Sequence, residues 1–511
     1  MLTFIIRRVL IGLGILLVSS FLLYLLVDLT IDPLEDLAQS TATNKEFLIA
    51  QRIEQLELDK PVIQRYFEWI GGIFTGDLGT AWRTNRPVGD LLQGAIISTV
   101  QLVSAATVLS ILLGVAVGIV SALRQYSGFD YLITFVSFLL FSLPSFWVAV
   151  LLKQWGAIGF NDFLANPWIA WGIVIGLGII AGFLWQLAIG GALKRRLING
   201  AIGAAATIGA LAFLQLSGWW ETPNIGPVIL AVTSVVIAFA VTALSTGLKN
   251  RRALYTALTC AALGVALWYP VRFYLFYYLT DYMNWGVVAL LGLLAAGVGI
   301  GIGVLYRGPD WKQSARTGGI VAFLVAGLIF IDQVMSVWGP YYNSNAINGR
   351  PIPTIGDRTP NLGGNWWVGV LDSYTHLLLP TLALMLISFA GYTRYSRGSM
   401  LEVMNQDYIR TARAKGLTER TVVVRHGFRN SLIPLATIVP LDVITLIGGA
   451  IITERIFGRP GMGQLFLQSL DGAEIEPVMA YLLIVSFLAI VANIIADLIY
   501  AVLDPRIRVN A

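Results

Sequence analysis

The sequence predicts an all-α polytopic membrane protein, and three observations lead to this fold class. Of the 511 residues, 57% are hydrophobic and only 12% are charged, whereas a soluble protein carries roughly 25% charged residues. Apolar runs near the roughly 20 residues that a spanning helix needs recur along the chain. Short polar loops separate these runs, and alternate loops are rich in Lys and Arg. We expect twelve membrane helices in the cell membrane with both chain ends in the cytoplasm, because basic loops collect on that side.

The first 155 residues are expected to hold three of these spans. The run 9–27 follows Arg7 and Arg8 as in a signal peptide, but it lacks a small-residue cleavage site and is long enough to span, so we interpret it as a retained helix. The polar stretch 28–93 belongs outside, and we expect its short amphipathic pieces to lie along the membrane surface. The other two spans are 95–123 and 131–152.

The third span contains a proline in the sequence Ser142-Leu143-Pro144-Ser145. Because proline removes one backbone hydrogen bond, we expect a kink at Pro144. Kinked helices tend to line pathways, so Pro144 and Ser145 are candidates for a translocation path. A kink that only fits the neighbouring helices explains the pattern equally well.

Residues 156–338 form an inserted region with six more apolar runs. Three of its loops are basic, at 194–196, 249–252 and 307–316, and the intervening loops are not. The positive-inside rule assigns the basic loops to three cytoplasmic hairpins. An even number of added spans leaves the orientation of the flanking segments unchanged. The six runs are 168–190, 200–219, 226–248, 253–269, 285–306 and 317–338.

The segment 339–375 is polar and turn-rich, and the span count places it outside. We interpret its aromatic residues as anchors at the membrane interface, with a binding surface for an extracytoplasmic partner as the alternative. These residues are Tyr341, Tyr342, Trp366 and Trp367. The remaining region, 376–511, is expected to hold three spans, at 376–394, 434–453 and 478–502.

The most informative stretch is the loop 395–433 between two of these last spans. From Arg394 to Arg429 the chain carries eight Lys or Arg and three Asp or Glu, so this stretch must lie in water, and its positive charge favours the cytoplasm. Small residues at Thr411, Ala412 and Ala414 would allow a partner to approach closely, and Gly416 would end a helix. Arg410, Arg413 and Lys415 would offer positive charge to an acidic rim. A basic amphipathic helix lying on anionic lipid is the alternative.

The pattern Thr411-Ala412-x-x-x-Gly416, followed by Asn430-Ser431-Leu432-Ile433-Pro434, resembles the cytoplasmic coupling loop of ABC-importer permeases of the peptide/nickel branch. Further similarities cover residues 1–155 and 375–511. Two features depart from the family pattern: Thr30-Ile31-Asp32-Pro33 replaces Pro-Gly-Asp-Pro, and the six-helix insertion is not part of the common core. The similar motifs are Leu58-Asp59-Lys60-Pro61, Gly76-Asp77-Leu78-Gly79, Leu143-Pro144-Ser145-Phe146-Trp147, Phe457-Gly458-Arg459-Pro460-Gly461-Met462-Gly463 and Asp504-Pro505-Arg506.

The resemblance implies a type I importer core of six helices plus about six additional ones. It also implies a transport role, in which the chain and a second, similar permease subunit form the path for di- or oligopeptides. Two ABC ATPase subunits would bind the ATP, so no cofactor is expected in this chain, and an extracytoplasmic solute-binding protein would deliver the cargo. Nickel and oligosaccharides remain alternative cargoes. The residues that the resemblance assigns to ATPase coupling are Arg410, Thr411, Ala412, Arg413, Lys415 and Gly416.

Several other function classes are disfavoured by the sequence. The dipeptide Gly-Lys is absent, so there is no Walker A loop, and there is no Gly-x-Ser-x-Gly elbow. The two histidines, His376 and His426, fall on opposite faces in this topology, which excludes a histidine-pair metal site, and Cys260 is the single cysteine. Nucleic-acid binding is disfavoured because the basic residues sit at helix ends, as the positive-inside rule requires. We therefore do not expect an enzyme.

An ion-coupled secondary transporter is the rival from a different class, and it would need carboxylates along a path. Three acids lie within apolar runs: Asp332, Asp442 and Asp497. We expect Asp497 to pair within the bundle and Asp332 to lie near the outer interface. Asp442 is a candidate for the path that could touch a cationic substrate, although pairing within the protein is the favoured interpretation.

Overall fold

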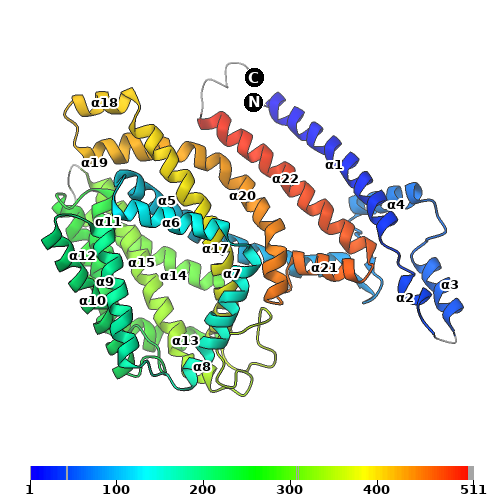
Figure 1. The fold of residues 1–511 in the computed structure, drawn as a ribbon, viewed down its shortest axis with the longest axis horizontal. Coiled ribbons are helices and arrows are strands. Elements are labelled where there is room, and N and C mark those ends of the chain that lie inside the picture. Colours follow the sequence, from blue (N-terminus) through cyan, green and yellow to red (C-terminus); the bar gives the residue numbers. More distant parts are fainter. Residues whose placement is uncertain (1, 42–43, 307, 309, 504–511) are drawn as a thin grey trace.

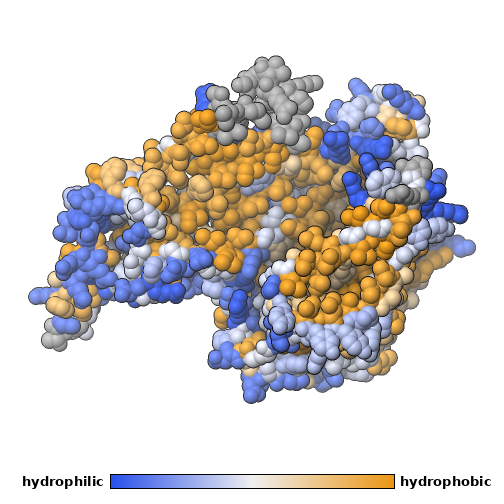
Figure 2. Space-filling model, turned by 180° about the vertical axis from the view of Figure 1, so that it is seen from behind, coloured by the Kyte–Doolittle hydropathy of each residue, from blue (hydrophilic) through white to orange (hydrophobic). Residues whose placement is uncertain are grey.

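The computed structural model describes residues 2–41, 44–306, 308 and 310–503, and these residues form a helical membrane protein (Figure 1). Eleven of the helices in the described ranges are long and apolar enough to cross a membrane, and a bent pair of helices brings the number to twelve if it counts as one span. A broad apolar surface bounded by hydrophilic residues covers the face seen in Figure 2. The predicted fold class is therefore confirmed. The terminal Asp504-Pro505-Arg506 motif lies outside the described residues.

The N-terminal part of the core runs from α1 to α8. A long first helix is followed by three short ones and a two-stranded hairpin, in which Thr80 pairs with Pro87. The elements are α1 (Leu2–Thr30), α2 (Glu35–Ala38), α3 (Lys45–Gln55), α4 (Val62–Thr75), β1 (Thr80–Ala81), β2 (Arg86–Pro87), α5 (Val88–Leu123), α6 (Gly128–Ser142), α7 (Ser145–Leu151), the π-helix η1 (Leu152–Gly159) and α8 (Phe160–Ala165).

The inserted region follows α8 and contains six long helices. Pro270 is the last residue of α12, which continues directly into a π-helical turn. The elements are α9 (Trp171–Ile189), α10 (Leu193–Leu216), α11 (Gly226–Ser245), α12 (Arg251–Pro270), the π-helix η2 (Val271–Leu275), α13 (Phe276–Leu279), the 3-10 helix η3 (Thr280–Tyr282), α14 (Trp285–Leu305), α15 (Trp311–Ser336) and α16 (Trp338–Tyr342).

The C-terminal part of the core completes the chain. Its first helix, α17 (Trp366–Met404), extends beyond both ends of the predicted span 376–394; the Asn365 side chain caps its start, and Pro380 lies inside it without ending it. The other elements are α18 (Asp407–Ala414), α19 (Glu419–Thr421), the π-helix η4 (Val422–Phe428), α20 (Arg429–Ile456), α21 (Met462–Asp471) and α22 (Ile475–Leu503).

Helices α5 and α17 join the two parts of the core that the insertion separates in sequence. Gly114 and Gly118 of α5 lie against α17 so closely that a Cβ on either would collide with Tyr392 or Ser396. The Ser396 hydroxyl donates a hydrogen bond to the Gly114 carbonyl at 3.2 Å. Small residues at such a crossing let two membrane helices pack backbone to backbone. Leu102, Val103 and Ala106 of α5 continue the contact with Leu384 and Met385 of α17.

The third predicted span is broken at Pro144 rather than kinked. Helix α6 ends at Ser142, α7 starts at Ser145, and the two directions differ by 102°. Pro144 is the N-cap of α7, where its missing N–H costs no hydrogen bond. The helical segment then continues through η1 and α8 to Ala165, so the expected boundary between residues 155 and 156 falls inside it.

The inserted helices lie on one side of α17, away from α1 and α22 (Figure 1). At one end, the Asn161 side chain of α8 exchanges two hydrogen bonds with the Ile352 backbone, at 2.7 and 3.1 Å. At the other end, two arginines of the core donate to carbonyls at the C-termini of inserted helices. Arg124 reaches Ala188 at 2.7 Å and Arg420 reaches Ala243 at 2.5 Å. Guanidinium groups at helix C-termini satisfy free carbonyls and stabilise the helix dipole.

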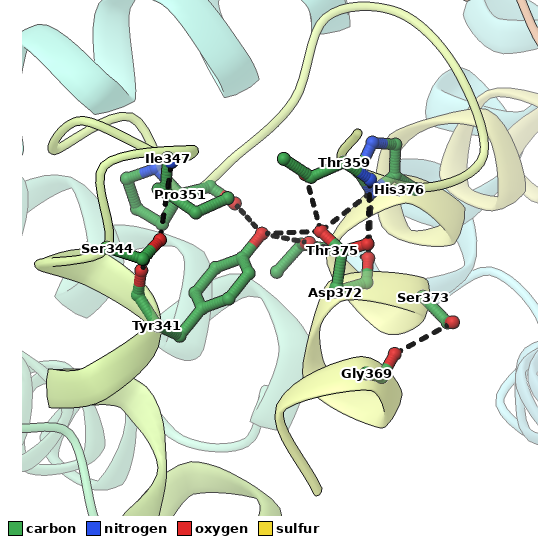
Figure 3. Close-up of polar contacts among 10 residues, drawn as sticks. All are labelled: Tyr341, Ser344, Ile347, Pro351, Thr359, Gly369, Asp372, Ser373, Thr375 and His376. Atoms are coloured by element: carbon green, nitrogen blue, oxygen red, sulfur yellow. Dashed lines mark hydrogen bonds and ion pairs between the residues drawn. The ribbon is translucent and has the colours of Figure 1, made fainter. Parts of the chain in front are cut away.

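The segment between α16 and α17 folds back onto the start of α17 (Figure 3). The Asp372 carboxylate accepts hydrogen bonds from Thr359, at 2.6 Å from its hydroxyl, and from the Tyr341 hydroxyl at 3.2 Å. Tyr341 is fully buried and Trp367 is 1% exposed. The interpretation of these two aromatics as interfacial anchors is therefore wrong. They are core residues, and Trp367 packs against inserted Phe276 with ring centroids 4.9 Å apart.

Asp332 is a fully buried acid that holds three inserted helices together. Its Oδ1 accepts hydrogen bonds from the Ile225 and Gly226 backbone nitrogens at the start of α11, at 2.8 and 3.0 Å. Its Oδ2 accepts from Trp268 and Arg272, both at 2.8 Å. The sequence analysis expected Asp332 near the outer interface and did not predict these hydrogen bonds. Four donors stabilise the charge, so Asp332 has a structural role.

Replacing Asp332 by Ala should lower the stability of the inserted bundle. Breaking a buried ion pair leaves the partner charge uncompensated, which typically costs about 3–5 kcal/mol. Thermal unfolding of the purified protein in detergent measures the effect. Asp281→Ala, which removes an exposed acid of the same region, is the matched control. Equal melting temperatures for the two variants would contradict the structural role of Asp332.

Candidate functional site

The soluble loop that the sequence singled out forms a short helix, α18, at one end of the molecule (Figure 1). Ile409 and Ala412 face inward and pack against Val422, and all three are buried. Arg410, Thr411, Arg413 and Lys415 are exposed. The buried position of Ala412 means that it positions α18 on its support, whereas the exposed residues form the surface that a partner would meet.

Gly416 ends α18 in a left-handed backbone conformation with φ of +76°. The Gly416 nitrogen donates to the Arg413 carbonyl at 3.0 Å, and the Leu417 nitrogen donates to the Ala412 carbonyl at 3.4 Å. This pair of bonds is the Schellman motif, which favours glycine because an L side chain strains the left-handed conformation. A Cβ at this position would meet open space. The glycine is therefore required by the backbone and not by crowding.

The three cations of the loop differ in their partners. Arg413 forms a bidentate ion pair with Glu419, at 3.1 and 2.7 Å, and this hydrogen-bonded carboxylate raises the pKa of Arg413. Arg410 lies 3.6 Å from Asp407 with both side chains largely exposed. Lys415 is exposed and has no ion pair within the described part of the chain. Lys415 is thus the loop cation whose charge is most available to another subunit.

Contacts at its base connect α18 to the membrane helices. The Asn430 side chain at the start of α20 donates to the Tyr408 hydroxyl at 3.0 Å. Near the C-terminal end of α17, Arg397 forms two hydrogen bonds with Asp130 of α6, at 2.7 and 2.9 Å. Sequence reasoning missed the Arg397–Asp130 pair, because the residues are far apart along the chain and only their shared position near the basic turn at Arg124 could have suggested it.

The predicted path residues lie on helices that pack against one another, but the residues themselves form no hydrogen bond with one another in the described part of the chain. Pro144 is exposed and Ser145 is half-buried at the break between α6 and α7. Helix α7 packs against both α17 and α20. Asp442 lies midway along α20, and no hydrogen bond between it and the Pro144 break occurs among the described residues.

Asp442 has a hydroxyl neighbour, Tyr392 of α17, and no charged partner among the described residues. It forms no ion pair with any described residue, and its Oδ2 atom is buried without a hydrogen bond. Asp497, by contrast, lies 3.2 Å from Arg8 of α1, so its expected pairing within the bundle is confirmed. The sequence did not predict that Tyr392 interacts with the Asp442 carboxylate.

A metal or cofactor site is not evident from side-chain geometry. Across the residues that the structure describes, no three His, Cys, Asp or Glu side chains converge. His376 lies beside Asp372 at 3.5 Å, in the network of Figure 3. Cys260 is buried and unpaired.

This fold and loop define a polytopic helical protein with a water-exposed helix projecting from its membrane core. The family described as "Binding-protein-dependent transport system inner membrane component" matches residues 319–509, and its N-terminal counterpart matches residues 1–89. The chain belongs to this family of membrane transport components. The unmatched interval contains α5 to α8 and most of the insertion.

Relatives with peptide-transport names share this core. The oligopeptide transport system permease protein OppB of Mycobacterium tuberculosis is 38% identical over 188 residues, 37% of this chain and 56% of that protein. The dipeptide transport system permease protein DppB of Escherichia coli is 34% identical over 247 residues, 44% of this chain and 69% of that protein. The chain thus spans little more than half the length of the OppB relative.

A third relative extends the similarity into the insertion. The DppB of Alkalihalophilus pseudofirmus is 25% identical over 460 residues, 90% of this chain and 86% of that protein. The 10% of this chain that lies outside that alignment is shorter than the six inserted helices together. Much of the insertion therefore has an aligned counterpart in that protein.

Replacing Gly416 by Val should loosen the end of α18, because a left-handed conformation costs an L-residue about 1–2 kcal/mol. A loss of this size corresponds to about 5- to 30-fold faster local opening. Hydrogen–deuterium exchange of residues 407–417 measures it. Gly416→Asn is the control, since Asn tolerates this conformation. Unchanged exchange in the Val variant would show that the motif does not hold the loop.

Proposed function

We propose that this chain is the transmembrane subunit of an ATP-driven ABC importer for di- or oligopeptides. Family membership supports the importer role, and the names of the OppB and DppB relatives support peptides as the cargo. The single observation that carries the proposal is α18, a preformed helix whose outer face bears Arg410, Thr411, Arg413 and Lys415.

The proposed partners follow from this role. A second permease subunit completes the path, two ABC ATPases bind and hydrolyse ATP, and an extracytoplasmic binding protein delivers the peptide. ATP-driven closure of the ATPases moves α18, and the inner ends of α17 and α20 move with it. The ATPase role lies with these partners, and this chain acts as a transport subunit.

The α18 face is proposed to be cytoplasmic. Residues 190–192 and 246–250 lie at this face, where Arg124 and Arg420 meet the C-termini of α9 and α11. The start of α1 and the end of α22 lie at the same end of the molecule (Figure 1). Basic loops and both termini then share the cytoplasmic side.

Membrane-impermeant thiol labelling tests this orientation. Single cysteines at Arg195 and Lys312 should react only from the cytoplasm, and single cysteines at Glu221 and Asn345 only from outside, because all four positions are exposed. A Cys260→Ser background removes the native thiol. Labelling at position 195 from outside would overturn the assignment.

The coupling role is tested by charge reversal at Lys415. In proteoliposomes that contain both permeases, both ATPases and the binding protein, Lys415→Glu should weaken ATPase docking by about tenfold, equivalent to about 1.4 kcal/mol. Peptide uptake per ATP hydrolysed should fall accordingly. Lys312→Glu reverses an exposed charge of the insertion and should leave uptake unchanged. Equal uptake in both variants would show that Lys415 does not contribute to ATPase docking. A wild-type complex without ATP-driven peptide uptake would refute the proposed function.

A further inference from the structure

Asp442 places a carboxylate in the middle of the membrane core. Helix α20 has 28 residues, which corresponds to about 42 Å of helix, and Asp442 lies midway along it. The hydrocarbon core of a bilayer is about 30 Å thick, so the carboxylate lies well inside it. Charged groups at this depth are costly, and they persist where they pair or serve a transported solute.

Four buried carboxylates are satisfied by their own neighbours, whereas Asp442, like Glu476 of α22, has a buried oxygen without a hydrogen bond. Asp130, Asp332, Asp372 and Glu454 are all less than 4% exposed. Each accepts a hydrogen bond of 2.8 Å or shorter from a side chain: Arg397 donates to Asp130 at 2.7 Å, Arg272 to Asp332 at 2.8 Å, Thr359 to Asp372 at 2.6 Å and Thr99 to Glu454 at 2.6 Å.

The cations nearest to Asp442 along α17 are directed elsewhere. Arg397 is held by Asp130 of α6. Arg394 stacks on Phe141 of α6, with its guanidinium carbon 3.8 Å from the ring centroid. Both side chains therefore interact with α6, and neither forms an ion pair with Asp442 of α20. The negative charge is left without a counter-ion from these helices.

The groups around Asp442 favour a ligand that donates hydrogen bonds over one that accepts them. Pro440 lies inside α20 and has no N–H, so the carbonyl one turn earlier, at Ala436, loses its helical donor. The buried Tyr392 hydroxyl lies close enough to interact with the Asp442 carboxylate, although without a hydrogen bond of ordinary geometry, and its residue is only 2% exposed. The Asp442 side chain itself is half-buried, so one oxygen stays within reach of a ligand. An ammonium group, with one positive charge and three donors, matches a carboxylate with a hydroxyl beside it.

We propose that Asp442, with Tyr392 beside it, binds the ammonium group of the cargo during its passage through the membrane. For a peptide cargo this group is the free α-amino terminus. The inference rests on the proposed function, since it assigns the recognition of that cargo to a particular carboxylate. Asp442 acts as a binding residue, and the carboxylate stays charged while the ammonium group is present.

The test measures binding of trialanine and N-acetyl-trialanine to the full complex of both permeases and both ATPases. Omitting the binding protein removes its own preference for free amino groups from the measurement. Losing a hydrogen bond between charged groups should weaken trialanine binding to Asp442→Asn by about tenfold or more. N-acetyl-trialanine, which has no ammonium group, should bind weakly and equally to the wild type and the variant. Asp442→Glu keeps the charge and should bind trialanine more tightly than Asp442→Asn.

Asp497→Asn is the matched control, because it removes an acid from another membrane helix that is already paired with Arg8. It should leave the difference between the two peptides unchanged. An equal loss of both peptides in Asp442→Asn, unchanged binding of trialanine, or no measurable binding of trialanine to the wild-type complex would each overturn the inference. ATP-driven uptake by the wild-type complex with its binding protein separates the two proposals. If uptake is intact, any of these outcomes refutes only the role of Asp442. If uptake is absent, both the proposed function and this inference are refuted.

Discussion

The close packing of α5 against α17 is the contact on which the rest of the structure depends. These helices belong to the two parts of the core that six inserted helices separate along the chain. Gly114 and Gly118 allow the backbones to approach, and Leu102 and Ala106 extend the contact toward α20. In hydrocarbon, association cannot rely on expelling water, so close packing of small residues has to hold the helices together. With α5 and α17 fixed, α18 emerges at one end of α17 and the outer segment folds onto the other.

The same contact explains how a movement of α18 could reach the membrane helices. Arg397 links the C-terminal end of α17 to α6 through Asp130, and Asn430 links α20 to α18 through Tyr408. The Schellman motif at Gly416 makes α18 a stiff end of this linkage. Arg420 extends it to the inserted helix α11, so the insertion is attached to the α18–α19 segment and, through Phe276 and Trp367, also to the start of α17.

The sequence predicted the membrane helices well, because a spanning helix needs a long apolar run and basic loops mark its ends. It located the break at Pro144, but not its size of 102°, which is set by the packing of α7 against α17 and α20. It also located the exposed loop around Lys415. Partners distant in sequence could not be predicted, as the network of Asp332 with Trp268 and Arg272 shows. Tyr341 and Trp367 were misplaced for the same reason, since aromatic residues of a turn-rich segment can serve equally as interface anchors or as core.

The central claim is that the exposed face of α18 docks an ATPase subunit. Cross-linking with a short bismaleimide tests it most directly, with a single cysteine at Arg410 in the Cys260→Ser background and single cysteines on the ATPase surface. Arg410 is 72% exposed at its side chain, so the reagent can reach it. If α18 docks the ATPase, position 410 should give a cross-linked permease–ATPase product, and position 345, between α16 and α17, should give none. A complex that hydrolyses ATP and transports peptide, yet gives no cross-link from position 410 with any ATPase cysteine, would contradict it.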